Sequence, residues 1–319
     1  MSRYVKISSI GDPPFPVPKG ISDDNACELV LNWIEKNLEK ALWDKPDIIA
    51  LPETVASPAG YTLQKKPGYF EKVEPLVFKM VVEKAKKGNC NIVFPGYVRE
   101  GGKIFNAQRL IDRRGNVTGC YKKSFPIIPE IEMGITPGGE QELMKSDVGT
   151  IAGSICFDLN FYPILFYTAS LHPEIIIFSS MYHGGLMQQV WAYFCRAHFV
   201  GSVSGKPNAI LNPTGLELYT TTNYFNVVTG IINLDGAMIH WDFNFERGGR
   251  FEQAKKYYGP DLQKSEPGYL DSVYITSESK DFTIEDVIKR FEFERLDDYF
   301  RRSIDHNAKA RGYEFLTKI

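Results

Sequence analysis

The sequence predicts an α/β protein whose β-structure is mixed, with both parallel and antiparallel strands. Apolar runs of strand length alternate with stretches of helical periodicity in three successive rounds over the first 200 residues. Such alternation is typical of crossover units between parallel strands. Two pairs of strand-like runs also flank short turn sequences, which indicates hairpins and therefore antiparallel neighbours.

The first round begins with a strand at 4–11. A helix is expected at 23–43, where apolar residues recur at helical spacing behind an acidic start. The run DIIALPE at 47–53 is expected to be a buried strand that its proline ends. These segments form one strand-helix-strand unit.

The second round comprises a helix at 70–87 and a strand at 91–100. The runs 103–112 and 116–123 flank the turn sequence RRG and are expected to form a hairpin. The third round is expected to contain strands at 149–156 and 174–181 and helices at 162–172 and 188–201.

The last third of the chain has a different character. A second hairpin is expected at 228–241 around the turn NLDG, and an amphipathic helix at 281–303. Beyond about residue 255 the composition becomes charged and aromatic. We therefore expect one α/β domain over 1–255 and a C-terminal extension over 256–319 that braces the domain or joins subunits.

Composition excludes several classes of protein. The 37 basic and 39 acidic residues give a net charge of -2, without the basic blocks of a protein that binds nucleic acid or a membrane surface. No apolar stretch is long enough to span a bilayer, and the first residues do not resemble a signal peptide. The five cysteines are widely spaced and the five histidines lack metal-ligand spacing, so we expect a cytoplasmic protein without disulfides, metal or cofactor.

Three polar side chains stand at the ends of predicted strands: Glu53, Lys123 and Cys156. Ligands of open α/β sheets bind where strands turn into loops. Each residue alone has a simpler explanation, as a solvated turn residue, a surface lysine and a small core residue respectively. Together, a carboxylate, an ammonium and a thiol form a coherent nucleophilic site.

The order and local sequence of these residues resemble the nitrilase, or carbon-nitrogen hydrolase, superfamily over residues 4 to about 250. The matching segments are ALPE, FNAQRLIDRRGNVTGCYKKSFP and SICFDLNF. The resemblance implies a four-layer αββα sandwich with mixed sheets and a Glu-Lys-Cys triad of Glu53, Lys123 and Cys156, with Lys122 as the neighbour of the catalytic lysine. In this reading Glu53 accepts the thiol proton, while Lys123 and the backbone N–H of Phe157 stabilise the oxyanion.

Local motifs are nearest to the aliphatic amidase and formamidase branch, which implies a second active-site glutamate shortly after the lysine. The segment KKSFPIIPEIEMGITPGG offers two. We prefer Glu132, because the sequence around it best resembles that branch, and keep Glu130 as the alternative. The segment MYHGGLMQQV also resembles this branch, which implies that Tyr182 and His183, together with Asn160, line the substrate pocket.

The expected function is hydrolysis of a non-peptide C–N bond, namely cleavage of a small neutral amide through a cysteine thioester. Nitrile hydrolysis, N-carbamoyl hydrolysis and acyl transfer could use the same triad. Carbamoyl-amino-acid hydrolases of the superfamily carry arginines where this chain has Leu159 and Asn160, which favours an uncharged substrate. A non-enzymatic interaction domain would be expected to have lost a triad member. The partners expected are the substrate and further copies of this chain, as a homodimer or larger assembly, with no nucleic acid and no membrane.

Overall fold

The computed structural model describes residues 2–205, 207–241, 249–265 and 271–313. By its internal contacts the chain forms two compact units, Val5–Ile232 and Met1–Tyr4 with Asn233–Ile319. Residues 233–255, which the sequence analysis assigned to the first domain, belong to the second unit in this division.

The larger unit contains two six-stranded sheets, and the first has the strand order β12-β1-β2-β3-β4-β5. Its strands are β1 (Tyr4–Ile10), β2 (Ile48–Ala50), β3 (Asn91–Glu100), β4 (Lys103–Ile111), β5 (Val117–Lys122) and β12 (Val227–Asn233). β1, β2 and β3 run parallel, whereas β4 is antiparallel to both β3 and β5. The hairpin predicted around the turn RRG is therefore confirmed.

The second sheet has the order β11-β10-β9-β8-β7-β6. Its strands are β6 (Met144–Lys145), β7 (Thr150–Ile155), β8 (Ile175–Ser180), β9 (His198–Val203), β10 (Ala209–Leu211) and β11 (Glu217–Thr220). A parallel centre, β7-β8-β9, is again flanked by antiparallel strands. Both sheets are mixed, as the sequence predicts.

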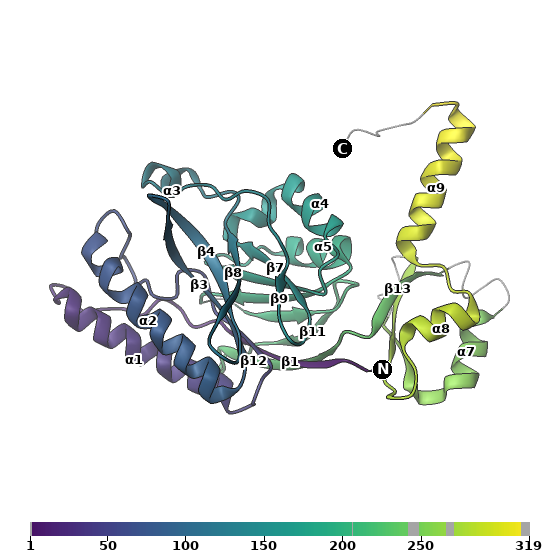
Figure 1. The fold of residues 1–319 in the computed structure, drawn as a ribbon, viewed down its shortest axis with the longest axis horizontal. Helices are drawn as coiled ribbons and strands as arrows, with labels where there is room; N and C mark the ends of the chain where they lie inside the picture. Colours follow the sequence, from purple (N-terminus) through teal and green to yellow (C-terminus); the bar gives the residue numbers. More distant parts are fainter. Residues whose placement is uncertain (1, 206, 242–248, 266–270, 314–319) are drawn as a thin grey trace. The chain divides into compact units, whose positions relative to one another are not determined.

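Helices cover the outer faces of the two sheets. α1 (Asp23–Leu42) and α2 (Pro67–Gly88) lie together on one side of this unit, and α4 (Tyr162–Ser170) and α5 (Leu186–Cys195) on the other (Figure 1). Apolar residues of α1 and α2 share one buried cluster with residues of β2 and β3. The four-layer αββα sandwich is confirmed.

The facing sides of the two sheets carry small and polar side chains as well as apolar ones. The Ser202 hydroxyl donates to the Ile10 carbonyl at 2.7 Å, and the Ser9 hydroxyl donates to the Gly201 carbonyl at 2.7 Å. At Gly153 the approach is so close that a Cβ would lie 2.6 Å from the Tyr121 ring. Hydrogen bonds between the sheets therefore fix how their strand ends meet.

The helix predicted at 188–201 is wrong in its second half. α5 ends at Cys195, because Arg196 adopts a left-handed conformation with φ of 53° and its N–H bonds back to the last turn. The following residues form β9, which is buried along its whole length. A continuously apolar strand next to a helix extends the helical pattern, and periodicity alone does not separate them.

The hairpin predicted at 228–241 is also wrong. Its two runs form β12 and β13 (Gly236–His240), but β12 belongs to the first sheet and β13 pairs with β15 (Ser272–Ser277). The turn sequence therefore marks the passage from one unit to the other.

The smaller unit is built on a three-stranded antiparallel sheet in the order β13-β15-β14, with β14 at Leu262–Ser265. Its core joins strand residues Ile239, Val273 and Ile275 to Phe251 of α7 (Arg250–Tyr258) and Val287 of α8 (Ile284–Phe291). None of the described helices is long and apolar enough to cross a membrane.

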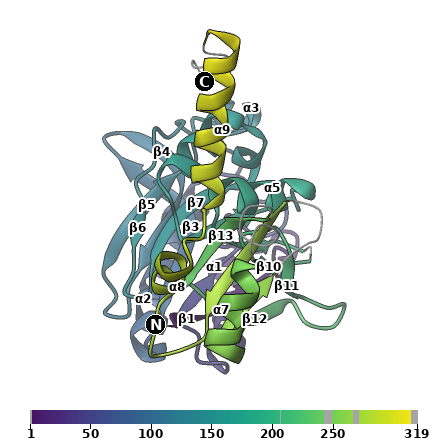
Figure 2. The same cartoon turned by 90° about the vertical axis from the view of Figure 1, so that its right-hand side faces the viewer.

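The single helix predicted at 281–303 is two helices (Figure 2). Glu292 ends α8 with φ of 52°, and α9 runs from Leu296 to Arg311. Leu296 is the only buried residue of α9, while Phe300 and Ile304, one turn apart, are 40% and 62% exposed. A helix with so little buried surface gains little stability from packing within its own unit.

We predict that Phe300 and Ile304 contact a second copy of this chain. Replacing both by Glu should reduce the molar mass in light scattering from that of an assembly to that of one chain, because two charges cannot be buried in an apolar contact. Arg301→Glu is the matched control on the same helix, since its side chain is 74% exposed. An unchanged mass in the double variant would count against the prediction.

Candidate active site

Glu53, Lys123 and Cys156 follow the ends of β2, β5 and β7, and the structure brings them together. The Lys123 ammonium lies 2.9 Å from Oε1 of Glu53. The Cys156 thiol lies within electrostatic range of both the Glu53 carboxylate and the Lys123 ammonium. Because β2 and β7 belong to different sheets, the cluster forms only where the carboxyl ends of the two sheets meet.

Cys156 occupies a strained backbone position. It is the first residue of the 3-10 turn η1 (Cys156–Asn160), and its φ is +48°. A non-glycine residue is uncommon in this region, and such strain gathers at functional sites. The sharp turn from β7 presents the thiol at the sheet edge, and the N–H groups of the first turn have no acceptor within their own helix.

A second carboxylate completes the cluster around Lys123. Oε2 of Glu130 lies 2.8 Å from the ammonium, and the side chains of Lys123, Glu53 and Glu130 are 2%, 5% and 10% exposed. Glu130 belongs to α3 (Ile128–Glu132), and its Oε2 also accepts the N–H of Ile127 at 2.9 Å. One buried ammonium therefore lies between two buried carboxylates.

The geometry places Glu130, the alternative, and not the preferred Glu132, beside Lys123. Glu132 is exposed, whereas Glu130 is buried against Lys123. Residues two apart on a helical turn point in nearly opposite directions, so only one of the two can face the cluster. The family resemblance in the sequence does not indicate which of these two side chains faces Lys123.

Asn106 is a member of the cluster that the sequence analysis missed. Its Nδ2 donates to Oε1 of Glu53 at 2.8 Å and to Oε1 of Glu130 at 2.9 Å, so it bridges the two carboxylates. Asn106 lies on β4, and Gln108, two residues on, donates to Oγ of Ser179 at 2.7 Å. The sequence did offer one signal for these residues: two polar side chains, two positions apart, in an otherwise apolar strand.

Electrostatics give the thiol and the amine distinct protonation states. Burial, and then the Glu53 charge, raise the pKa of Cys156 to about 12, against a smaller opposite effect of Lys123. Burial lowers the pKa of Lys123, but the charges of Glu53 and Glu130 outweigh it and raise that pKa above its ordinary value. At neutral pH the cysteine is thus a thiol that needs a base, and the lysine is an ammonium ion.

The other expected pocket residues divide into two groups. Asn160 donates through Nδ2 to the Tyr182 hydroxyl at 2.9 Å, and burial raises the pKa of Tyr182 to about 12, with the nearby Cys156 adding to the effect. The Phe157 side chain is exposed and packs edge-on against Phe161, so its relevant group is the backbone N–H beside the thiol.

His183 is not brought into the cluster by any contact of the described residues. It is exposed, and its Nδ1 accepts the N–H of Gly185 at 3.1 Å. No group of three His, Cys, Asp or Glu side chains within the described ranges is placed to hold a metal ion.

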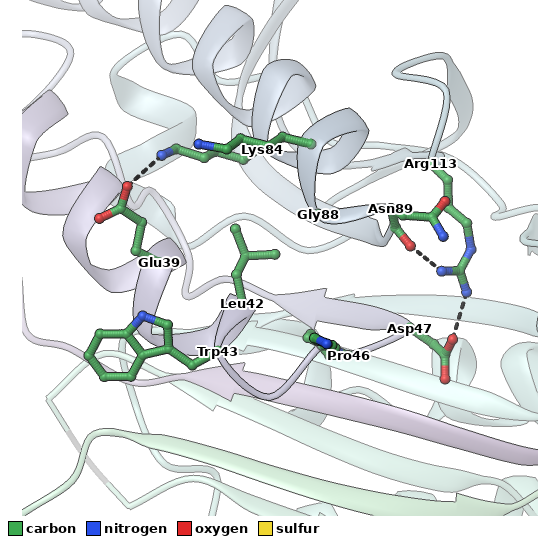
Figure 3. A pocket seen from close by; sticks show the side chains of 11 residues that line it. Glu39, Leu42, Trp43, Pro46, Asp47, Lys84, Gly88, Asn89 and Arg113 are labelled. Carbon is green, nitrogen blue, oxygen red and sulfur yellow. Dashed lines mark hydrogen bonds and ion pairs between the residues drawn. The ribbon is translucent and has the colours of Figure 1, made fainter.

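A separate pocket lies at the opposite ends of the strands (Figure 3). It is lined by the C-terminal ends of α1 and α2 and by the segments before β2 and β3. Its charges bind one another, with Lys84 2.9 Å from Glu39 and Arg113 2.7 Å from Asp47. We interpret this region as a structural charge network, because it lacks a nucleophile and faces away from the carboxyl ends of the strands.

Comparison with known families agrees with this architecture. A family model described as Carbon-nitrogen hydrolase matches residues 26–201. The chain belongs to the carbon-nitrogen hydrolase family. No curated protein sequence gives a significant match to this chain.

Solved structures of the nitrilase superfamily are similar in fold. The C. elegans NitFhit protein is 15% identical with a TM-score of 0.64; the match covers 73% of this chain and 61% of that one. An amidase from Nesterenkonia sp. is 15% identical with a TM-score of 0.61, covering 72% and 90%. Saccharomyces cerevisiae Nit3, a member of branch 10 of the nitrilase superfamily, is 14% identical with a TM-score of 0.58, covering 72% and 90%. Identities this low establish the shared fold and leave the activity open.

Removing the buried ammonium should destabilise this unit. We predict that Lys123→Met lowers the free energy of unfolding by about 3 to 5 kcal/mol, since two buried carboxylates then lack a counter-charge. The loss should be larger at pH 8 than at pH 5, because protonation of a carboxylate relieves the uncompensated charge. Urea unfolding at both pH values measures it.

The control for this prediction is Lys122→Met. Lys122 is half-buried and pairs with Glu100, a largely exposed partner, at 2.8 Å. Such a surface pair contributes roughly 0 to 1 kcal/mol. Equal losses for the two lysine variants, or a loss for Lys123→Met that does not depend on pH, would contradict the prediction.

Proposed function

We propose that this carbon-nitrogen hydrolase is an amidase that cleaves small neutral amides through a thioester on Cys156. The observation that carries the proposal is the buried cluster of Lys123, Glu53 and Glu130, in which the ammonium lies 2.9 Å from Glu53, next to the Cys156 thiol on which both groups act electrostatically. A protonated thiol, a base in contact with it and a fixed cation are the three groups that acyl transfer requires.

Glu53 is arranged to act as the base. Its Oε1 is occupied by Lys123 and Asn106, while Oε2 accepts the N–H of Met181 at 3.2 Å. The Met181 N–H also acts on Cys156, which supports Oε2 as the oxygen that receives the thiol proton. As the sulfur attacks the amide carbon, its proton passes to Glu53 and the carbonyl oxygen becomes an oxyanion.

The oxyanion would be stabilised by the Lys123 ammonium and the Phe157 N–H, each contributing about 3 kcal/mol by analogy with other oxyanion holes. Glu53 then returns its proton to the leaving nitrogen, and ammonia or an amine departs. Water, deprotonated by the same carboxylate, attacks the thioester; the acid is released and the thiol is restored.

The local charge supports an uncharged substrate. Glu53 and Glu130 against Lys123 give the cluster two formal negative charges and one positive charge. Leu159 is fully buried and Asn160 uses its amide hydrogens on Tyr182 and the Phe157 carbonyl, so neither can neutralise an anion. A substrate carboxylate close to this cluster would be repelled.

Solved structures of similar fold agree with this chemistry. A mutant of the Nesterenkonia sp. amidase carries the acetamide moiety of fluoroacetamide covalently at its active-site cysteine. Another mutant of that amidase forms a complex with butyramide. These statements concern that amidase; by analogy of fold they support a nucleophilic thiol at Cys156 and a small neutral amide as its ligand.

The proposal is tested with a panel of neutral amides, matching nitriles and N-carbamoyl amino acids. We predict acyl-enzyme on Cys156 by intact mass, and ammonia release fastest from a neutral amide. Cys156→Ala should lower turnover at least about a hundredfold while keeping the fold, because only a thiol is lost. Nitriles or carbamoyl amino acids as the best substrates, or acyl transfer to an added amine in place of water, would contradict the amidase proposal.

The two glutamates of α3 offer a matched pair of variants. We predict that Glu130→Gln lowers kcat/KM at least about a hundredfold. Lys123 then loses one of its two carboxylate partners, and the negative charge of Glu130 no longer faces the substrate. Glu132→Gln should change kcat/KM less than about twofold, as expected for an exposed residue. The reverse order of effects would restore Glu132 as the active-site glutamate.

A further inference from the structure

Asp158 is a buried carboxylate next to the site that the mechanism above does not use. Its side chain is fully buried. Oδ2 accepts the N–H of Ile155 at 3.1 Å and the hydroxyl of Tyr121 at 2.7 Å. Oδ1 accepts the N–H of Phe125 at 2.8 Å. One carboxylate therefore binds donors from two segments, the cysteine turn and the chain around Lys123.

These donors flank the two reactive residues. Ile155 immediately precedes Cys156, so its bond to Asp158 fixes the turn that carries the thiol. Tyr121 and Phe125 lie two residues before and two residues after Lys123. Because β5 and β7 belong to different sheets, Asp158 joins the cysteine turn of one sheet to the lysine segment of the other.

Asp158 is not placed to react with a substrate itself. Both of its oxygens are engaged by protein donors, and the side chain has no exposed surface. Burial raises its pKa to about 6, while the Tyr121 hydroxyl, the two backbone N–H groups and the Lys123 charge lower it. At neutral pH it is mainly a carboxylate that can accept all three hydrogen bonds at once.

We propose that Asp158 is a positioning residue that sets the distance between the Cys156 thiol and the Glu53–Lys123 pair by clamping the cysteine turn to the lysine segment. The inference rests on the proposed function for its role in turnover. Its effect on thiol reactivity does not require that function. Errors of about 1 Å in the placement of reacting groups can cost two orders of magnitude in rate.

The test compares Asp158→Asn and Tyr121→Phe with the native chain. Asn at 158 sets an NH₂ group against a backbone N–H in either orientation, because Ile155 and Phe125 donate to opposite oxygens. Tyr121→Phe removes one donor and keeps the ring. We predict that each variant lowers kcat about tenfold or more with KM within about twofold, since placement and not binding is disturbed.

A second readout is independent of turnover. Alkylation of Cys156 by iodoacetamide, followed by peptide mass mapping, should slow about tenfold in both variants, because the thiol loses its contact with the base. Cys120 is exposed and serves as the internal control, with an unchanged rate. If amides are not substrates, the native chain shows no turnover while the difference in Cys156 alkylation persists, which separates failure of the amidase proposal from failure of this one.

Asp47→Asn is the matched control for loss of a structural aspartate. Asp47 accepts the Lys6 N–H at 2.9 Å and the Arg113 guanidinium at 2.7 Å, ahead of the strand β2 and away from its carboxyl end. We expect lower thermal stability without a change in kcat or in Cys156 alkylation. Native kcat and alkylation in folded Asp158→Asn would overturn the inference. If that variant does not fold, native alkylation in Tyr121→Phe would overturn it.

Discussion

The burial of one ammonium ion, that of Lys123, is the constraint on which the site depends. A buried ammonium is unfavourable unless it is paired and hydrogen-bonded. Here Glu53 and Glu130 lie within 2.9 Å of it, and Asn106 bridges the two carboxylates. In the same arrangement Lys123 and Asn106 both bind Oε1 of Glu53, while Oε2 accepts the N–H of Met181. The contacts that a buried ammonium requires therefore also hold the groups that the proposed mechanism uses.

The two sheets supply this arrangement because the parallel strands at the centre of each sheet end on the same side of the sandwich. Glu53 comes from the first sheet and Cys156 from the second, while Lys123 follows the antiparallel strand β5. Contacts such as those of Ser9, Ser202 and Gln108 hold the facing sides in register. Asp158 adds a charged connection at the site itself. The reactive groups are thus positioned by rigid elements, which suits chemistry that is sensitive to small displacements.

Burial also explains why the thiol depends on its neighbours. With a pKa raised to about 12, Cys156 is not a preformed thiolate. In the proposed mechanism the thiol gives its proton to Glu53 during attack, so the rate depends on the geometry between the thiol and this base. The exposed apolar residues of α9, Phe300 and Ile304, belong to the other unit and concern assembly.

The sequence by itself determined the α/β class, the mixed sheets, most strands and helices, and the three strand-end residues, because hydrophobic periodicity and turn chemistry are local properties. It did not separate α5 from β9, since both are apolar. It also predicted one helix where the left-handed backbone of Glu292 ends α8 before α9 begins. Only the tertiary structure decided that Glu130, and not Glu132, faces Lys123, and that Asn106 and Asp158 contact the site. Those facts depend on which way a side chain points and on contacts between distant segments, neither of which has a local signature.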